Sequence, residues 1–257
     1  MDPLAVGALL SDPAAWSITH VTRTGSTNAD LAASRAPHGR VLIAEEQMTG
    51  RGRSGRDWFC PEGAGLMFSV VLRIPQIPAD RRGWVGAVLG LAIVRAFDRI
   101  GAAGADLKWP NDVLISGRKC AGILGEVADD ALIVGAGINV SLQATELPRQ
   151  DATSLLLSGG SDRLDREALL AAILDEFGVL LNRWSGAKGD IDRSGLRSDY
   201  LTSCSTIGSR VRLILPGGRQ HLATAVDVGP DGALLVEDAE GRRSYSAADV
   251  VHLRPDR

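Results

Sequence analysis

Residues 50–58 are the segment whose residue types and spacing most clearly indicate a chemical role. It reads Gly-Arg-Gly-Arg-Ser-Gly-Arg-Asp-Trp, so three arginines alternate with three glycines. Glycine lets backbone amides approach a ligand closely, and arginine offers a permanently charged fork of donors that suits phosphate or carboxylate. The stretch therefore predicts a loop that wraps an anion with its amide groups. The residues themselves leave open a second interpretation, a basic tract that grips a nucleic acid backbone.

Length and composition limit the number of domains and the kinds of partner that we expect. The chain has 257 residues, 45% of them hydrophobic, and a formal net charge of −3. This length fits one large domain with a small appendage. The acidic balance argues against a general nucleic-acid binder, whose domain would be basic.

Cysteine and histidine usage predicts neither a disulfide framework nor a structural zinc site. The three cysteines are widely spaced and the four histidines are scattered. We expect a reduced, cytoplasmic setting. The first residues lack the basic start of a signal peptide, and we expect no membrane span because no apolar run is long enough.

Strands and helices are expected around the basic loop. Ile18–Thr22 alternates like a strand, and the apolar runs Val41–Ala44 and Leu66–Leu72 predict two more, the second of them central. Apolar residues at helical spacing predict helices over residues 84–100, 166–184 and 190–201.

Ser26 and Thr27 lie at a strand-to-helix turn. One interpretation is that a hydroxyl only caps the helix that follows. The other is that the hydroxyls face a ligand. The sequence leaves both open.

A three-part antiparallel meander is predicted from residue 106 to residue 140. We expect one strand over 106–115 with Pro110 at an edge or bulge, then strands over 119–127 and 131–140. Strict alternation puts Lys119 on the same face as Ala121 and Ile123. A lysine among apolar residues either meets an anion or snorkels at the strand end.

Two further pairs in the meander have alternative interpretations. Asn111 and Asp112 form either an ordinary turn or a site for magnesium and phosphates. Gly135 and Gly137 are either bulges or positions where a nucleotide approaches the strand.

The last fifty residues or so differ in composition from the rest. Short strands joined by tight turns predict a small β-barrel, SH3-like or OB-like. We place the domain boundary between residues 205 and 206, giving domains of 1–205 and 206–257.

Taken together, the motifs resemble the bacterial biotin protein ligases. The resemblance runs from about residue 18 to the C-terminus and is carried by Ser26-Thr27-Asn28, Gln47, the loop Gly50–Trp58, Pro61-Glu62-Gly63, Lys108-Trp109-Pro110-Asn111-Asp112, Gly117–Leu124 and Gly135–Asn139. It implies an α/β (α+β) fold, with a class II aminoacyl-tRNA synthetase-like catalytic domain around a mixed, mainly antiparallel sheet and an SH3-like C-terminal domain. It also implies that biotin and Mg-ATP give biotinyl-5′-AMP, which then acylates a lysine of a carrier domain.

The resemblance also assigns roles to individual residues. Lys119 and Arg53 are the expected catalytic residues. Biotin is expected to contact Ser26, Thr27, Asn28, Gln47, Arg51, Gly52, Arg53, Lys119 and Gly122. ATP and the adenylate are expected to contact Arg51, Arg56, Trp58, Trp109, Asn111, Asp112, Lys119 and Asn139. Magnesium is expected to bind mainly through phosphates, so no metal site made of side chains alone is predicted.

The expected partner is the biotin carboxyl carrier domain of an acyl-CoA carboxylase or of pyruvate carboxylase. Cys60 stands where the family commonly has serine, and we expect little effect. We predict no DNA binding, because the residues before the first strand are too few for a helix-turn-helix domain. A homodimer through an exposed sheet edge is compatible with the pattern and not required by it.

A lipoate ligase is the nearest rival interpretation of the sequence. It would be expected to carry a glycine-rich stretch ending in His-Asp, which we do not find.

Overall fold

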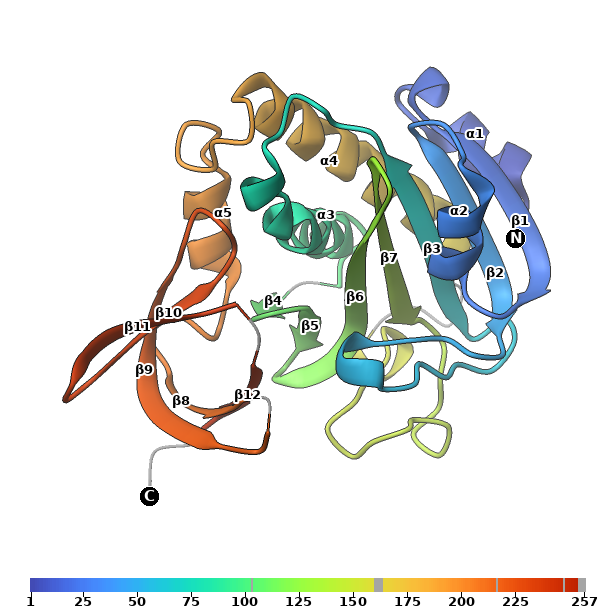
Figure 1. Cartoon of the computed structure of the whole chain (residues 1–257). Helices are drawn as coiled ribbons and strands as arrows, with labels where there is room; N and C mark the ends of the chain where they lie inside the picture. The colour runs from blue at the N-terminus through green and yellow to red at the C-terminus, as the bar shows by residue number, and fades with distance from the viewer. Residues whose placement is uncertain (103, 160–163, 216, 247, 254–257) are drawn as a thin grey trace.

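Two β-sheets organise the protein. The structure is a computed structural model that describes residues 1–102, 104–159, 164–215, 217–246 and 248–253. The first sheet has the strand order β1-β2-β3-β7-β6-β5-β4, and the second has the order β11-β10-β9-β8-β12 (Figure 1). In the first sheet only β1 and β2 pair in parallel, and the other neighbours are antiparallel. The predicted mixed, mainly antiparallel sheet is confirmed.

The first sheet contains the predicted strands with one correction. Its strands are β1 Ser17–Thr24, β2 Arg40–Gln47, β3 Gly65–Leu72, β4 Ala105–Lys108, β5 Asp112–Ile115, β6 Arg118–Ala128 and β7 Ala131–Asn139. The single strand expected over residues 106–115 is wrong, because β4 and β5 are separate strands that pair antiparallel. Pro110 has no N–H for a ladder. The N–H of Trp109 leaves the ladder as well, since it donates to Thr206 Oγ1 at 3.1 Å.

The described part of the chain contains five α-helices. They are α1 Pro3–Leu9, α2 Thr27–Ser34, α3 Val85–Arg99, α4 Arg166–Gly186 and α5 Leu196–Ser203. The sequence had not indicated α1, which begins after Asp2, whose carboxylate accepts from the N–H of Leu4. The predicted helix over 190–201 begins only at Leu196, because Gly195 before it has φ 74°.

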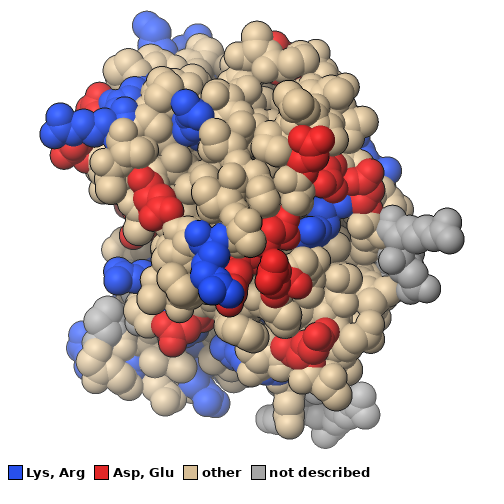
Figure 2. Space-filling view, turned by 90° about the vertical axis from the view of Figure 1, so that its right-hand side faces the viewer, with Lys and Arg blue, Asp and Glu red and all other residues tan. Residues whose placement is uncertain are grey.

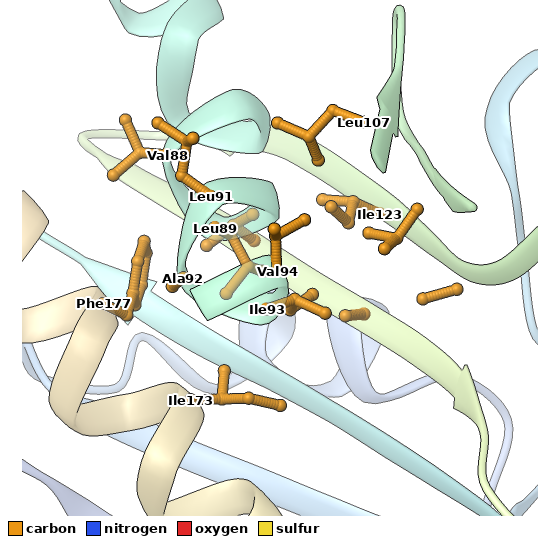
Figure 3. Close-up of a cluster of buried hydrophobic side chains, with 14 of the residues drawn as sticks. Val88, Leu89, Leu91, Ala92, Ile93, Val94, Leu107, Ile123, Ile173 and Phe177 are labelled. Atoms are coloured by element: carbon orange, nitrogen blue, oxygen red, sulfur yellow. The ribbon is translucent and has the colours of Figure 1, made fainter. Parts of the chain in front are cut away.

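The two faces of this sheet have different coverings. On one face α3 packs on β4–β7 and against α4, and Val88, Leu89 and Ile93 belong to the buried cluster that Phe177 of α4 joins (Figure 3). On the opposite face, Leu31 of α2 packs on Val71 and Ile133. The outer side, near β1 and α2, shows acidic and basic side chains interspersed (Figure 2).

The second sheet forms a small all-β unit that docks on the first domain. Its strands are β8 Arg210–Ile214, β9 Gln220–Val228, β10 Leu234–Asp238, β11 Gly241–Tyr245 and β12 Asp249–His252. Two indole N–H groups of the first domain hold it in place. Trp84 Nε1 donates to Gly229 O at 2.9 Å, and Trp109 Nε1 donates to Gly232 O at 3.1 Å. The antiparallel C-terminal unit is confirmed, and its SH3-like character and the 205/206 boundary remain predictions.

Candidate active site

A cavity of about 1030 Å³ lies between the first sheet, the 50–58 loop and the C-terminal sheet. Every residue that the sequence predicted for the site lines this cavity. These residues are Ser26, Thr27, Asn28, Gln47, Arg51, Gly52, Arg53, Arg56, Trp58, Trp109, Asn111, Asp112, Lys119, Gly122 and Asn139.

The loop over residues 50–58 is a tight hairpin. Arg51 and Asp57 form a β-bridge, the N–H of Trp58 donates to Gly50 O at 2.8 Å, and residues 53–55 make a single 3₁₀ turn. Gly50 has to be glycine, because a Cβ there would lie 2.4 Å from Trp58 O. The hairpin therefore delivers Trp58 to the cavity floor.

Trp58 lies on a flat floor made by two glycines. Gly122 of β6 and Gly137 of β7 are register partners, and a Cβ on Gly137 would lie 2.2 Å from the indole. The interpretation of Gly135 and Gly137 as bulges is wrong, because β7 pairs in unbroken register with both neighbours. Trp58 Nε1 is buried without a hydrogen-bond partner among the described residues, so it is a donor available to a ligand.

Lys119 lies on the cavity face, which corrects the prediction from strict alternation. Leu114 pairs with Lys119 and Val113 with Ala121, so β6 has one extra residue, Cys120, opposite β5. This bulge changes the alternation. Ala121 and Ile123 therefore pack in the core, while Lys119 Nζ lies 3.2 Å from the Cβ that Gly122 lacks.

An ion pair holds the Lys119 side chain. Lys119 Nζ lies 2.5 Å from Asp112 Oδ1 and 5.7 Å from the centre of the Trp58 ring. Asp112 Oδ1 is buried and has no well-aligned hydrogen bond within the described part of the chain, so the contact is a close ion pair rather than a directed bond. The ammonium group of Lys119 is thus held in the cavity beside a carboxylate, and the side chain does not snorkel to solvent at a strand end.

The hydroxyls at the start of α2 make no capping hydrogen bond. Ser26 occupies the N-cap position, but its side chain makes no capping bond. Gln47 Oε1 instead accepts from the N–H of Thr27 at 2.8 Å. The interpretation of Ser26 and Thr27 as caps alone is therefore wrong, and both line the cavity as neutral hydrogen-bonding groups.

The arginines form the opposite end of the cavity. The guanidinium of Arg53 lies 5.9 Å from the centre of the Trp109 ring. Burial lowers the pKa of Arg53, the charges of Asp249 and Asp112 oppose that shift, and Arg56 adds to it. Arg56 itself forms an ion pair with Asp249 of β12. This end combines guanidinium groups with nearby carboxylates.

Asn111 and Asn139 are both held by the main chain. Asn111 Nδ2 donates to Ile123 O at 3.0 Å, and Asn139 Nδ2 donates to Thr153 O at 2.9 Å. Their amide oxygens are therefore the groups that remain for a ligand.

Sequence reasoning missed several polar residues of the cavity wall, and four of them are Arg149, Asp151, Asp249 and His252. Arg149 donates two bonds of 2.7 Å to Asp151, and this hydrogen bonding lowers the pKa of the Asp151 carboxyl. From the C-terminal sheet come Asp249 and His252, and burial lowers the pKa of His252. No motif marks these four residues, because their place in the wall depends on how distant segments dock.

Comparisons with known proteins agree with this geometry. The family "Biotin/lipoate A/B protein ligase family" matches residues 17–142, and "Biotin protein ligase C terminal domain" matches residues 206–253. The biotin--[acetyl-CoA-carboxylase] ligase of Mycobacterium tuberculosis is 42% identical over 241 residues, which cover 91% of this chain and 88% of that protein. The chain belongs to the biotin protein ligase family.

Other family members extend the likeness. The bifunctional ligase/repressor BirA of Bacillus subtilis is 31% identical over 238 residues, or 90% of this chain and 71% of that protein. The solved biotin protein ligase from Aquifex aeolicus in complex with biotin and ATP has a TM-score of 0.78 at 27% identity and covers 93% of this chain and 99% of its own. The biotin protein ligase resemblance that the motifs carried is therefore confirmed.

Proposed function

We propose that this chain joins biotin to ATP as biotinyl-5′-AMP and then transfers the biotinyl group to a lysine of a biotin carboxyl carrier domain. The observation that carries the proposal is the pairing, in one cavity, of a neutral hydrogen-bonding end around Thr27 with a cationic end around Arg53. A ureido ring fits the first end and phosphates fit the second.

Adenylate formation brings two anions together. A biotin carboxylate oxygen attacks the α-phosphorus, and pyrophosphate leaves. Lys119 stands where fixed positive charge offsets the repulsion between carboxylate and α-phosphate. Arg51 and Arg53 close over the acyl-phosphate, and Arg56 takes the departing phosphates. In the second step the acceptor amine attacks the acyl carbon, loses a proton, and AMP leaves.

The flat side chains and polar oxygens complete the assignment. Trp58 and Trp109 provide apolar walls for biotin or adenine. The side-chain oxygens of Asn111 and Asp112 would hold magnesium, together with the phosphates of ATP. No group of three histidine, cysteine, aspartate or glutamate residues that could hold a metal occurs in the part of the chain that the structure describes. A bound ion would neutralise charge on the phosphates.

The acceptor is proposed to be the carrier domain of an acyl-CoA carboxylase or of pyruvate carboxylase. Two family members bear the name biotin--[acetyl-CoA-carboxylase] ligase. We also propose a cytoplasmic location and no DNA binding. Of the helices in the described ranges, none is long and apolar enough to cross a membrane.

The test is biotin-dependent exchange of pyrophosphate into ATP, run beside lipoate. We expect exchange with biotin and none above background with lipoate. Exchange that depends on lipoate instead would overturn the substrate assignment.

A second measurement separates the two half-reactions. Replacing Arg53 with glycine is expected to weaken retention of the adenylate, so free biotinyl-AMP escapes and labels bystander lysines. If the variant labels only the carrier domain, Arg53 does not close over the intermediate.

A further inference from the structure

A hydrogen-bond network with a buried inner part links the cavity to an exposed carboxylate that is not among the cavity residues. Asn28 Nδ2 donates to Glu126 Oε2 at 2.8 Å and lies 3.2 Å from Leu124 O. Both neighbours are acceptors, so only the amide nitrogen can face them. The amide oxygen of Asn28 must point the other way. We call Glu126, Asn28, Ser69 and Thr27 the Glu126 network.

The direction of donation along this network follows from Asn28. Its Oδ1 can only accept, so Ser69 Oγ donates to it at 2.6 Å. Ser69 then has no proton left, and Thr27 Oγ1, also 2.6 Å away, donates to Ser69. The same hydroxyl proton of Thr27 also makes a weaker contact with Gln47 Oε1, which lies 3.1 Å from Thr27 Oγ1. Thr27 is left with lone pairs for a ligand.

The same network orients Gln47. Its Oε1 accepts from the N–H of Thr27 at 2.8 Å, which turns its Nε2 away as a donor. This end of the cavity therefore presents an acceptor, Thr27 Oγ1, beside a donor, Gln47 Nε2. A ureido group needs that pair, because its N–H groups donate and its carbonyl accepts.

Three members of the network are closed to water, whereas Glu126 at its outer end is exposed. Ser69 is fully buried, and Thr27 and Asn28 are 4% and 5% exposed. Gly135 lies directly beneath, and a Cβ there would lie 2.4 Å from Asn28 Oδ1. Water has little access to Asn28, Ser69 and Thr27, so loss of a partner by one of these three weakens the orientation of the next.

We infer that Glu126 and Ser69 are positioning residues that set the donor and acceptor pattern at the ureido end of the site. Glu126 acts through Asn28, and Ser69 passes that orientation to Thr27. The inference rests on the proposed function, because the ureido group is that of biotin.

The test compares Glu126→Met with Glu126→Gln. Glutamine retains an acceptor oxygen and methionine does not. Because methionine cannot accept from Asn28 Nδ2, we expect the KM for biotin to rise about tenfold in Glu126→Met and to stay within about twofold in Glu126→Gln. The KM for ATP stays unchanged in both. Ser69→Ala, a second variant, raises the KM for biotin in the same direction.

Two controls separate positioning from a general structural role. Desthiobiotin keeps the ureido group but lacks the sulfur, so its KM rises by the same factor as that of biotin. Asp129→Asn, in the exposed turn that follows β6, leaves both KM values unchanged.

The outcomes distinguish this inference from the proposed function. If the wild-type protein exchanges pyrophosphate with biotin but Glu126→Met keeps the wild-type KM for biotin, the inference is overturned alone. A parallel rise in the KM for ATP overturns it as well. A wild-type protein without biotin-dependent exchange overturns the proposed function and the inference together.

Discussion

The two ends of the cavity are built from different interactions. The end around Thr27 rests on a helix start and central strands, and its buried neutral groups hydrogen-bond to one another. The end around Arg56 rests on a hairpin loop and the C-terminal sheet, and its ion pair is about half exposed. Buried hydrogen bonds define orientation, whereas exposed ion pairs exchange partners at little cost. The first end is suited to select a ligand and the second to release one.

Removing the ammonium group of Lys119 should have the largest effect on the rate of pyrophosphate exchange. We expect Lys119→Ala to slow pyrophosphate exchange by about 10²–10³-fold, because transition-state charge loses its fixed counter-charge. Lys188→Ala, an exposed loop change, is the matched control. The protein should stay folded by circular dichroism. If Lys119→Ala exchanges pyrophosphate near the wild-type rate, Lys119 does not offset the repulsion between carboxylate and α-phosphate.

Adding a side chain at Gly137, below the Trp58 indole, should weaken binding at both ends of the cavity. In Gly137→Ala the new Cβ would lie 2.2 Å from the indole, so Trp58 has to move. Overpacking of this kind costs about 1–3 kcal/mol, so we expect exchange to fall about tenfold.

The control for Gly137→Ala is Gly86→Ala. A Cβ at Gly86 would find its nearest neighbour, Ile123, at 3.7 Å, an ordinary contact. Unchanged KM values for biotin and ATP in Gly137→Ala would show that Trp58 does not shape the cavity.

Neutralising the acid partner of Arg56 tests the cationic end alone. Asp249→Asn frees Arg56 and removes a negative charge that would repel phosphates. We expect the KM for ATP to fall about twofold to fivefold and the KM for biotin to stay constant. Glu237→Gln, on β10, is the control. A rise in the KM for ATP would mean that Asp249 assists the nucleotide instead.

A change outside both ends should alter stability without altering activity. Glu45 contacts the Met1 amino group, His20 and Arg166. Burial alone would raise the Glu45 pKa, but hydrogen bonds and charges from Met1 and Arg166 lower it to about 2. A lowered folded pKa stabilises the protein above the unfolded pKa of about 4.3 and loses that contribution as pH falls toward 2.

Glu45→Gln is therefore expected to lower the free energy of unfolding by roughly 2 kcal/mol at pH 7. The difference from wild type should shrink between pH 4.5 and pH 2, as followed by denaturant unfolding. Both KM values should stay constant. A difference that persists unchanged at pH 2 would assign the stability to packing rather than to charge.

Much of the fold and site could be predicted from local pattern. Helical spacing predicted α3 and α4, alternation predicted β1, and apolar runs predicted β2 and β3. These elements depend on neighbours in sequence, and the physical chemistry of a short window determines them. The fifteen lining residues came from the resemblance to the biotin protein ligases. The turn at Trp109 was missed because its N–H finds a partner in the distant Thr206.

The sequence by itself determined which chemical groups are present and which strands and helices carry them. Tertiary structure alone decided two features of the site. The bulge at Cys120 turned Lys119 toward Asp112, and register against a neighbouring strand cannot be read from one strand. Docking of the C-terminal sheet brought Asp249 and His252 into the wall, because Trp84 and Trp109 donate to the turn between β9 and β10. Both features depend on contacts between segments far apart in the chain.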